Sequence, residues 1–501
     1  MSIRVRERFS PPKPEDITAI RRAIARFDPS ASTTIVGADK AKLHDVFAPI
    51  AHSKALDPAT TLVLGARGAG KSFWASALYN QDTRQLAAVL YPRLGLERLQ
   101  VQIGFGGVDR AGVPKSVIDQ LVPPRQEKTA ADRFWKAVIA GAALKVTEPE
   151  RKHPPKEMLY RFADPADWAD AMAKVDDDLT DRGETLLIVF DALDAMSEDW
   201  ARLSGLIDAL MRSVWELRGF NAIRAKLFMR PDQLSELTLR FVELPKLRSG
   251  AAKLGWNQAD LYGLMFARLA FDEEAGVAFG RFLKSRGLGK QPEKQEELRT
   301  WTLSNNENQQ QQLFEAMAGH FMGNGPRKGR TFDWPYNHLA DGLGDVTPRS
   351  FLILMQSAAE RSEDRDAGGL VLLPQTIRDG LREASKVRIE QLNTEYPWIK
   401  RVLQPLAGLR VPAAPQVFYD AWIENATVEA AVKIARKENS LPPVQIRSGG
   451  KPGHSDREID LAHRLTKMGV LTSRPDGRYD MPDLFRVGAA LLKKGGVTPK
   501  A

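Results

Sequence analysis

The stretch Thr61–Ser72, with the sequence TLVLGARGAGKS, decides the fold of this chain. Its apolar residues 62–64 predict a short buried strand, and residues 65–72 match the pattern G-x-x-x-x-G-K-[ST] at every fixed position. Glycines let such a loop fold closely around a polyphosphate, so that several backbone N–H groups point at one anion, and the helix that follows adds its positive end. The stretch therefore predicts a phosphate-binding loop between a strand and a helix.

The expected nucleotide contacts come from this loop and the first helical turn. The Lys71 ammonium is expected to reach the β- and γ-phosphates, and the Ser72 hydroxyl to ligate Mg²⁺. A glycine-rich turn with a chance lysine is the alternative, which the strand before the loop and the helix after it disfavour. The predicted cofactor-binding residues of the loop are Gly65, Ala66, Arg67, Gly68, Ala69, Gly70, Lys71, Ser72 and Phe73.

A second informative stretch is Thr185–Asp194, TLLIVFDALD. Its run of apolar residues predicts a strand that is buried on both faces, and acids at the carboxyl end of such a strand emerge where open α/β sheets bind ligands. This is a Walker B pattern. Asp191 is expected to hold Mg²⁺ directly or through water, and Asp194 to orient or deprotonate the attacking water. We expect this strand tip and that of the phosphate-binding loop to be neighbours.

The composition limits the classes of protein to which this chain can belong. The 501 residues are enough for two to four domains, and 43% of them are hydrophobic. The net charge of +9 is concentrated at the end of the chain, where residues 431–501 hold 14 Lys and Arg against 7 Asp and Glu. The absence of cysteine excludes disulfides and thiolate zinc sites. A charged N-terminus and the lack of an apolar run of about 18 residues predict a cytoplasmic protein without a membrane segment.

Further elements follow from periodicity. Helices are expected at 15–27, 40–52, 129–146 and 199–217, and strands at 99–103, 224–230 and 241–244, with an insertion around 84–180. Arg230 stands at the tip of the strand that begins at Arg224, which Pro231 closes. Thr347 and Pro348 predict the start of another helix, which places Arg349 in its first turn.

These motifs resemble bacterial P-loop ATPases of the STAND/AAA+ type over roughly Thr34 to Glu360. The resemblance implies a parallel-sheet core, ATP and Mg²⁺ as ligands, and Arg230 as a catalytic sensor at the tip of the strand after Walker B. It also implies that Arg349 senses the γ-phosphate from a helical lid. A hydrophobic-Gly box at residues 34–39 would contact adenine through Val36 and Gly37, although Ala38 stands where an Arg is frequent.

The predicted domains are an N-terminal extension (1–33), a P-loop core (34–250), a helical lid and helical region (251–430) and a basic, winged-helix-like domain (431–501). In the last, a helix at 456–468 precedes two short strands around Pro475–Gly477, and a final helix is expected from Asp483 to Lys494. Arg474 and Arg478 would lie on the wing. They would touch DNA phosphates if the domain binds duplex DNA, whereas in STAND-like proteins such domains often pack internally.

Two functions stay open from the sequence. The first is an ATP-driven switch that forms homo-oligomers or signals to a partner protein, as in bacterial antiphage or conflict defence. The second is a DNA-associated AAA+ ATPase that grips double-stranded DNA through residues 431–501. A metabolic P-loop kinase is disfavoured, because the chain has a helical lid and shows no phosphoacceptor site. Arg240 and Arg248 are candidates for an arginine finger.

Overall fold

The computed structural model describes residues 12–29, 41–107, 112–236, 241–363, 365, 368–444 and 454–499. The chain forms two compact units. Residues Ser30–Gly255 make the first, which we call the sheet unit; residues Met1–Pro29 and Trp256–Ala501 make the second, the helical unit. The N-terminal segment therefore belongs with the second half of the chain, although it precedes the phosphate-binding loop in sequence.

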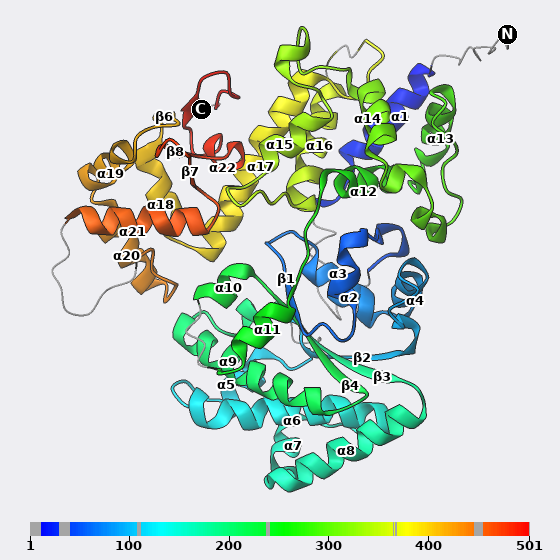
Figure 1. Ribbon diagram of the computed structural model, residues 1–501, viewed down its shortest axis with the longest axis vertical. Coiled ribbons are helices and arrows are strands. Elements are labelled where there is room, and N and C mark those ends of the chain that lie inside the picture. Colours follow the sequence, from blue (N-terminus) through cyan, green and yellow to red (C-terminus); the bar gives the residue numbers. More distant parts are fainter. Residues whose placement is uncertain are drawn as a thin grey trace. The chain divides into compact units, whose positions relative to one another are not determined.

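The sheet unit is built on a five-stranded sheet in the order β2-β3-β4-β1-β5, and every pair of neighbouring strands is parallel (Figure 1). Parallel strands need helical crossovers, which cover the sheet and bury its strands as continuous apolar runs. This is the α/β fold that the sequence predicts. The strands are β1 (Leu62–Leu64), β2 (Leu99–Phe105), β3 (Thr185–Phe190), β4 (Ile223–Met229) and β5 (Ala252–Lys253).

Strand β4 lies between β1 and β3. Leu62 pairs with Leu227 on one side of β4, and Leu186 pairs with Ile223 on the other. The expectation that the loop strand and the Walker B strand are direct neighbours is therefore wrong. Because all three strands run the same way, their carboxyl ends still reach the same edge of the sheet.

Helices pack on the sheet through apolar faces. Trp135 of α6 is fully buried, meets Phe190 of β3 edge to face, and donates from Nε1 to the carbonyl oxygen of Leu206 on α9 at 3.0 Å. The helices of this unit are α2 (Ser53–Leu56), α3 (Lys71–Tyr79), α4 (Gln81–Leu90), α5 (Lys115–Leu121), α6 (Glu127–Thr147), α7 (Pro155–Arg161), α8 (Pro165–Asp181), α9 (Trp200–Glu216), α10 (Pro231–Glu236) and α11 (Leu244–Gly250). Between α4 and β3, the predicted insertion consists of β2 and α5–α8.

Two predicted elements of the sheet unit are wrong. Residues 241–243 are not a strand, and α11 begins at Leu244 with Pro245 in its first turn, because proline lacks the N–H that a ladder needs. The last strand is β5. The helix expected at 40–52 is instead two 3₁₀ turns at Leu43–Asp45 and Ile50–His52, since Pro49 interrupts it.

The helical unit begins with α1, which packs on α13 and α16. Asn257 caps α12 in a capping box with Asp260. At the start of α16, the Thr347 hydroxyl accepts from the Ser350 N–H, in agreement with the helix start that the sequence predicts. The helices are α1 (Pro14–Ala25), α12 (Gln258–Ala270), α13 (Gly276–Ser285), α14 (Glu307–Ala318), α15 (Asp333–Leu339), α16 (Pro348–Glu363), α17 (Pro374–Glu395) and α18 (Ile399–Leu403).

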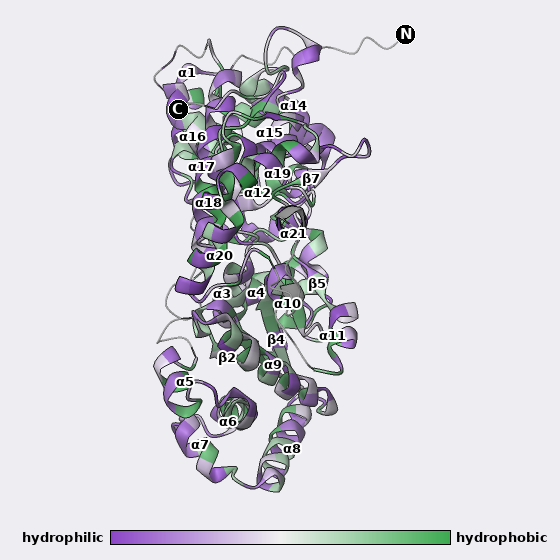
Figure 2. Cartoon of the chain, turned by 90° about the vertical axis from the view of Figure 1, so that its left-hand side faces the viewer, coloured by the Kyte–Doolittle hydropathy of each residue, from purple (hydrophilic) through white to green (hydrophobic). Residues whose placement is uncertain are grey.

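Buried and surface helices differ in the hydropathy of their residues. Figure 2 shows α12 coloured largely as hydrophobic, and nearly all its side chains from Ala259 to Ala270 are buried. The same view shows α8 with many hydrophilic residues, in agreement with its narrow buried stripe of Trp168, Met172 and Leu179. Within the described ranges, no helix combines the length and the apolar character needed to cross a lipid bilayer.

In the described residues, the end of the chain holds four helices and two small sheets. β7 and β8 form an antiparallel hairpin, and β9 pairs in parallel with β6. The helix expected from Asp483 to Lys494 is only one turn long, because Ala490 takes a left-handed φ of 60° and Lys493 belongs to β9. The elements are β6 (Arg410–Val411), α19 (Pro415–Glu424), α20 (Thr427–Lys437), α21 (His454–Lys467), β7 (Thr472–Ser473), β8 (Tyr479–Asp480), α22 (Asp483–Arg486) and β9 (Leu492–Lys493).

Candidate functional site

The predicted phosphate-binding loop lies between the carboxyl end of β1 and the start of α3. Gly68 and Gly70 take left-handed φ values of 85° and 98°, which glycine adopts without steric cost. A Cβ on Gly65 would lie 3.2 Å from Lys71 Cγ and 3.3 Å from the Ala69 Cβ. The glycines at these positions therefore let the loop close tightly at the foot of α3.

Lys71 is folded back over its own loop. Its Nζ donates to the carbonyl oxygens of Gly65 at 2.7 Å and Ala66 at 3.1 Å. These two contacts place the ammonium above the loop before any ligand arrives. Arg67, Gly68 and Ala69 lie in the same turn, in which the Ala69 N–H donates to the Ala66 carbonyl at 3.1 Å. Phe73 is buried and meets the Trp74 ring at a centroid distance of 5.4 Å, so it packs under the helix.

Asp191 and Ser72 come together although their strands are not neighbours. Asp191 follows β3, is 1% exposed, and its carboxyl lies close enough to Ser72 of α3 for the serine side chain to influence its pKa. Burial raises the pKa of the Asp191 carboxyl, while the Ser72 side chain and the charge of Lys71 act against that rise. The Walker A lysine and serine and the Walker B aspartate thus form one cluster.

This cluster has the donor atoms of a magnesium site. Asp191 Oδ1 is buried and makes no hydrogen bond to the part of the chain that the structure describes. An orphaned carboxylate oxygen beside a serine hydroxyl suits a hard cation, because Mg²⁺ is usually held by one or two protein oxygens together with waters and substrate phosphates. No group of three or more His, Cys, Asp or Glu lies together as a metal site among the described residues. The site fits a cation that arrives with a polyphosphate.

Arg230 and Asp194 lie at the same edge of the sheet. Arg230 follows β4, between β1 and β3, and its Nη1 lies 3.3 Å from Asp194 Oδ2. Its Nε and Nη2 each donate to Asp232 at 3.1 Å. The Asp194 side chain is 47% exposed, whereas that of Arg230 is 9% exposed. Of the three predicted catalytic residues, Lys71, Asp194 and Arg230, the structure thus pairs the last two. It adds Asp232, which sequence analysis missed.

Asp232 could have been found from its place, because it follows the end of the buried strand β4 by three residues, much as Asp194 follows the end of β3 by four. No comparable pattern in the sequence indicated the role of His52. It is fully buried, its Nε2 lies 3.0 Å from the Gly255 carbonyl, and its Nδ1 accepts from Trp74 Nε1 at 3.1 Å. Burial lowers the pKa of His52 to about 4, so the ring is neutral and joins α3 to the end of the sheet unit.

Other predicted residues are not part of this cluster. Val36, Gly37 and Arg240 lie outside the described residues. Arg248 donates to the Leu234 carbonyl within the sheet unit. Arg349 is buried in the first turn of α16 in the helical unit, where the sequence places it, and its contact with a nucleotide stays a prediction.

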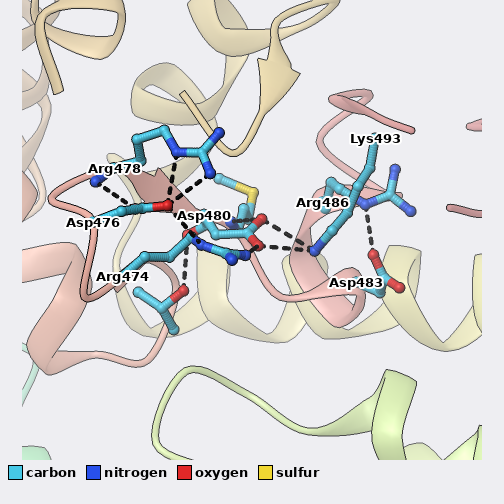
Figure 3. A network of polar contacts seen from close by, with 9 residues as sticks. Arg474, Asp476, Arg478, Asp480, Asp483, Arg486 and Lys493 are labelled. Carbon is cyan, nitrogen blue, oxygen red and sulfur yellow. Dashed lines mark hydrogen bonds and ion pairs between the residues drawn. The ribbon is translucent and has the colours of Figure 1, made fainter. Parts of the chain in front are cut away.

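The predicted wing of the basic tail is charge-compensated (Figure 3). Arg478 Nη2 lies 2.6 Å from Asp476, and Arg474 Nη1 lies 3.5 Å from Asp480. Lys493 Nζ pairs with the same Asp480 at 2.9 Å. The two arginines that were expected to meet DNA phosphates therefore already have carboxylate partners.

The tail also packs on the helices that precede it. The Gly342 N–H donates to the Gly469 carbonyl at 2.7 Å, and the Gly488 N–H donates to Ser385 Oγ on α17 at 2.8 Å. A Cβ on Gly342 would lie 2.8 Å from the Gly469 oxygen, which leaves no room for a side chain. These contacts favour the internal-packing alternative over DNA binding by a free domain.

The parallel sheet, the glycine-rich loop and the Lys71–Ser72–Asp191 cluster define an α/β protein with a P-loop fold. No protein-family model matches the chain, and no curated protein matches it. Solved structures that resemble it include the Aeropyrum pernix ORC2 protein in ADPNP-ADP complexes, with 13% identity and a TM-score of 0.39 over 91% of this chain and 94% of that one. Cdc6p from Pyrobaculum aerophilum has 12% identity and a TM-score of 0.28 over 93% and 97%. With TM-scores below 0.5, neither likeness carries an argument about function.

Proposed function

We propose that this chain is an ATP-binding and ATP-hydrolysing switch of the STAND/AAA+ type. The observation that carries the proposal is the proximity of Ser72 to the buried Asp191, because it brings the phosphate-binding loop and the acidic strand end to one point. Nucleoside triphosphatases need these two groups together, one to grip the phosphates and one to hold the metal. We also propose that the protein acts in the cytoplasm.

Each residue has a task in this proposal. The backbone N–H groups of residues 65–72 and the Lys71 ammonium bind the phosphates, while Ser72 and Asp191 hold Mg²⁺. The metal, when bound, neutralises charge on the β- and γ-phosphates. Asp194 orients the attacking water and accepts its proton. Arg230 lies beside Asp194 and stabilises negative charge at the γ-phosphate.

The switch follows from the loss of the γ-phosphate. Arg230 and Arg349 are the proposed sensors, so hydrolysis would release the contact that each is proposed to make with the γ-phosphate. An oligomer or a partner protein would then respond to the nucleotide state, as in antiphage or conflict defence. The alternative of DNA binding by residues 431–501 has less support, because Arg474, Arg478 and Lys493 are paired with aspartates.

Binding of a fluorescent ATP analogue and release of phosphate test the proposal. Lys71→Ala should weaken ATP binding by at least about tenfold, because a charge-assisted contact to phosphate is lost. Lys174→Ala, which removes an exposed lysine of α8, is the matched control and should bind as the wild type does. Asp191→Asn should abolish the Mg²⁺ dependence of binding. A wild-type protein that ignores adenine nucleotides would overturn the proposal.

Size measurement separates the two alternatives. The switch predicts a larger particle with ATP than without it, in the absence of DNA, and no such change for Lys71→Ala. The DNA-associated ATPase predicts salt-dependent binding of duplex DNA by the full chain. In that case Arg474→Gln with Arg478→Gln should weaken DNA binding, whereas an unchanged DNA affinity would place the contact elsewhere.

A further inference from the structure

A second cavity lies in the sheet unit, at the edge of the sheet opposite to the phosphate-binding loop. It has a volume of about 600 Å³ and is bounded by the starts of β1 and β4, the end of α9, and α11. The loop follows the last residue of β1 and Arg230 follows the last residue of β4, whereas this cavity contacts Leu62 and Ile223, the first residues of those strands. A strand of seven residues spans about 20 Å, so the two places are well separated.

The cavity is lined by cations and by apolar side chains. Arg218, Arg224 and Lys246 are its charged residues, and no carboxylate lines it. Like charges that share one cavity repel one another, and an anion in their midst would relieve that repulsion. The apolar lining consists of Leu62, Val214, Leu217, Ile223 and Leu247 together with Ala59 and Ala225.

Arg218 is held in place without using its hydrogen-bond donors. Its guanidinium lies over the Trp215 ring, with 4.3 Å between the guanidinium carbon and the ring centroid. It makes no hydrogen bond or ion pair with the residues that the structure describes. A guanidinium offers a planar fork of donors that matches a carboxylate or phosphate, so a positioned and unused fork suits an anionic group.

The other two cations are partly engaged. Arg224 donates from Nη1 to the carbonyl oxygens of Phe220 and Ile223, which leaves its Nε and Nη2 without a partner in the described chain. Lys246 pairs with Glu243 at 2.6 Å, and its side chain is 68% exposed. Arg218 and Arg224 therefore offer most of the unused N–H donors that could bind an anion.

We infer that this cavity binds a small organic anion, with its phosphate or carboxylate group on Arg218 and Arg224 and its apolar body against Val214, Leu217 and Leu247. The volume lies within the range of about 300–1,000 Å³ that is usual for small-molecule sites. This site is separate from the proposed nucleotide site and does not depend on it.

Fluorescence titration of the full chain with anilinonaphthalene sulfonate, an aromatic anion, tests the inference. Arg218→Gln with Arg224→Gln should weaken binding of this probe by about tenfold or more, because two charge-assisted donors are lost. Phenylnaphthylamine, which lacks the sulfonate, should bind both proteins equally. Arg98→Gln, at an exposed arginine far along the chain, is the matched control and should leave the affinity unchanged.

Two further measurements, one on a single variant and one with competitors, complete the test. Arg218→Gln alone removes no hydrogen bond to the described residues, so it should fold as the wild type does and still lose affinity for the probe. Phenyl phosphate and benzoate, used as competitors, distinguish the two anionic groups, and displacement by either supports the site. Equal affinity of the wild type and the double variant for the sulfonate, or no displacement by either competitor, would overturn the inference. Lys71→Ala should bind the probe normally, which separates this result from the ATP proposal.

Discussion

Arg230 and Asp194 form an ion pair across two strand ends, with 3.3 Å between Arg230 Nη1 and Asp194 Oδ2. Arg230 comes from β4 and Asp194 from the turn after β3, so the pair exists only because β4 and β3 are neighbours in the sheet. Asp232 accepts hydrogen bonds from Nε and Nη2 of the same guanidinium. The proposed water-orienting carboxylate is thereby coupled to the proposed γ-phosphate sensor.

Asp194→Asn should slow ATP turnover while ATP still binds. The amide keeps the shape of the side chain but cannot accept a proton, so we expect the turnover number to fall by about 10²–10⁴-fold. The affinity for ATP should stay within about threefold of the wild type, because the loop is untouched. Phosphate release and titration with a fluorescent ATP analogue measure the two quantities. Asp181→Asn, at an exposed aspartate of α8, is the control, and equal turnover by Asp194→Asn and wild type would remove the proposed role.

Arg230→Gln should reduce the preference for ATP over ADP. The guanidinium is proposed to meet the γ-phosphate, so its loss should weaken ATP binding by about tenfold and leave ADP binding nearly unchanged. Parallel titrations with ATP and ADP analogues give the ratio of the two affinities. If that ratio matches the wild type, Arg230 serves only to hold Asp194 and Asp232.

His52 should make the protein sensitive to acid. Burial lowers its pKa from the ordinary 6.5 to about 4, so the folded state binds fewer protons than the unfolded chain between these values. Stability from this residue is present above pH 6.5 and is lost as the pH falls towards 4, by up to about 3 kcal/mol. Urea unfolding at pH 7 and pH 5 should show a smaller decrease for His52→Gln than for the wild type. The same decrease in both proteins would assign the acid sensitivity to other groups.

Lys226→Met should destabilise the sheet unit. Lys226 is fully buried in β4, and its Nζ donates to the carbonyl oxygens of Ala55, Asp57 and Thr60 at 2.8–2.9 Å. Methionine fills similar space but leaves these acceptors without a donor, which should lower the free energy of unfolding by about 2–4 kcal/mol. Lys174→Met, at an exposed lysine, should change it by less than about 0.5 kcal/mol. Thermal or urea unfolding compares the two, and equal stability would show that water replaces the ammonium.

The sequence predicted those parts of the site that are encoded over short stretches. The glycine-rich loop, the strand before it and the helix after it occupy consecutive residues, and glycine, lysine and serine have their roles at fixed spacing. The Walker B strand was also predicted, since such an apolar run is typical of a strand buried on both faces and the phosphate-binding loop lies upstream of it. The parallel α/β fold followed, and the sheet confirms it.

Errors arose where local pattern and tertiary packing disagree. The apolar residues at 241–244 resemble a strand, but Pro245 starts a helix there. The tail was expected to end in a helix, but the left-handed backbone of Ala490 and the pairing of β9 with β6 prevent it. Neither outcome depends on propensity alone, because strand pairing supplies hydrogen bonds that a short helix lacks.

By itself, the sequence determined that a phosphate-binding loop and a buried acidic strand end are present, because each is specified by residues close together in the chain. Only the tertiary structure decided that β4 lies between them, that Ser72 nevertheless reaches Asp191, and that Arg230 pairs with Asp194. It also decided that Arg474 and Arg478 of the tail pair with neighbouring aspartates. The physical reason is that charge pairing and burial depend on which distant segments pack together, and spacing along one chain does not specify this.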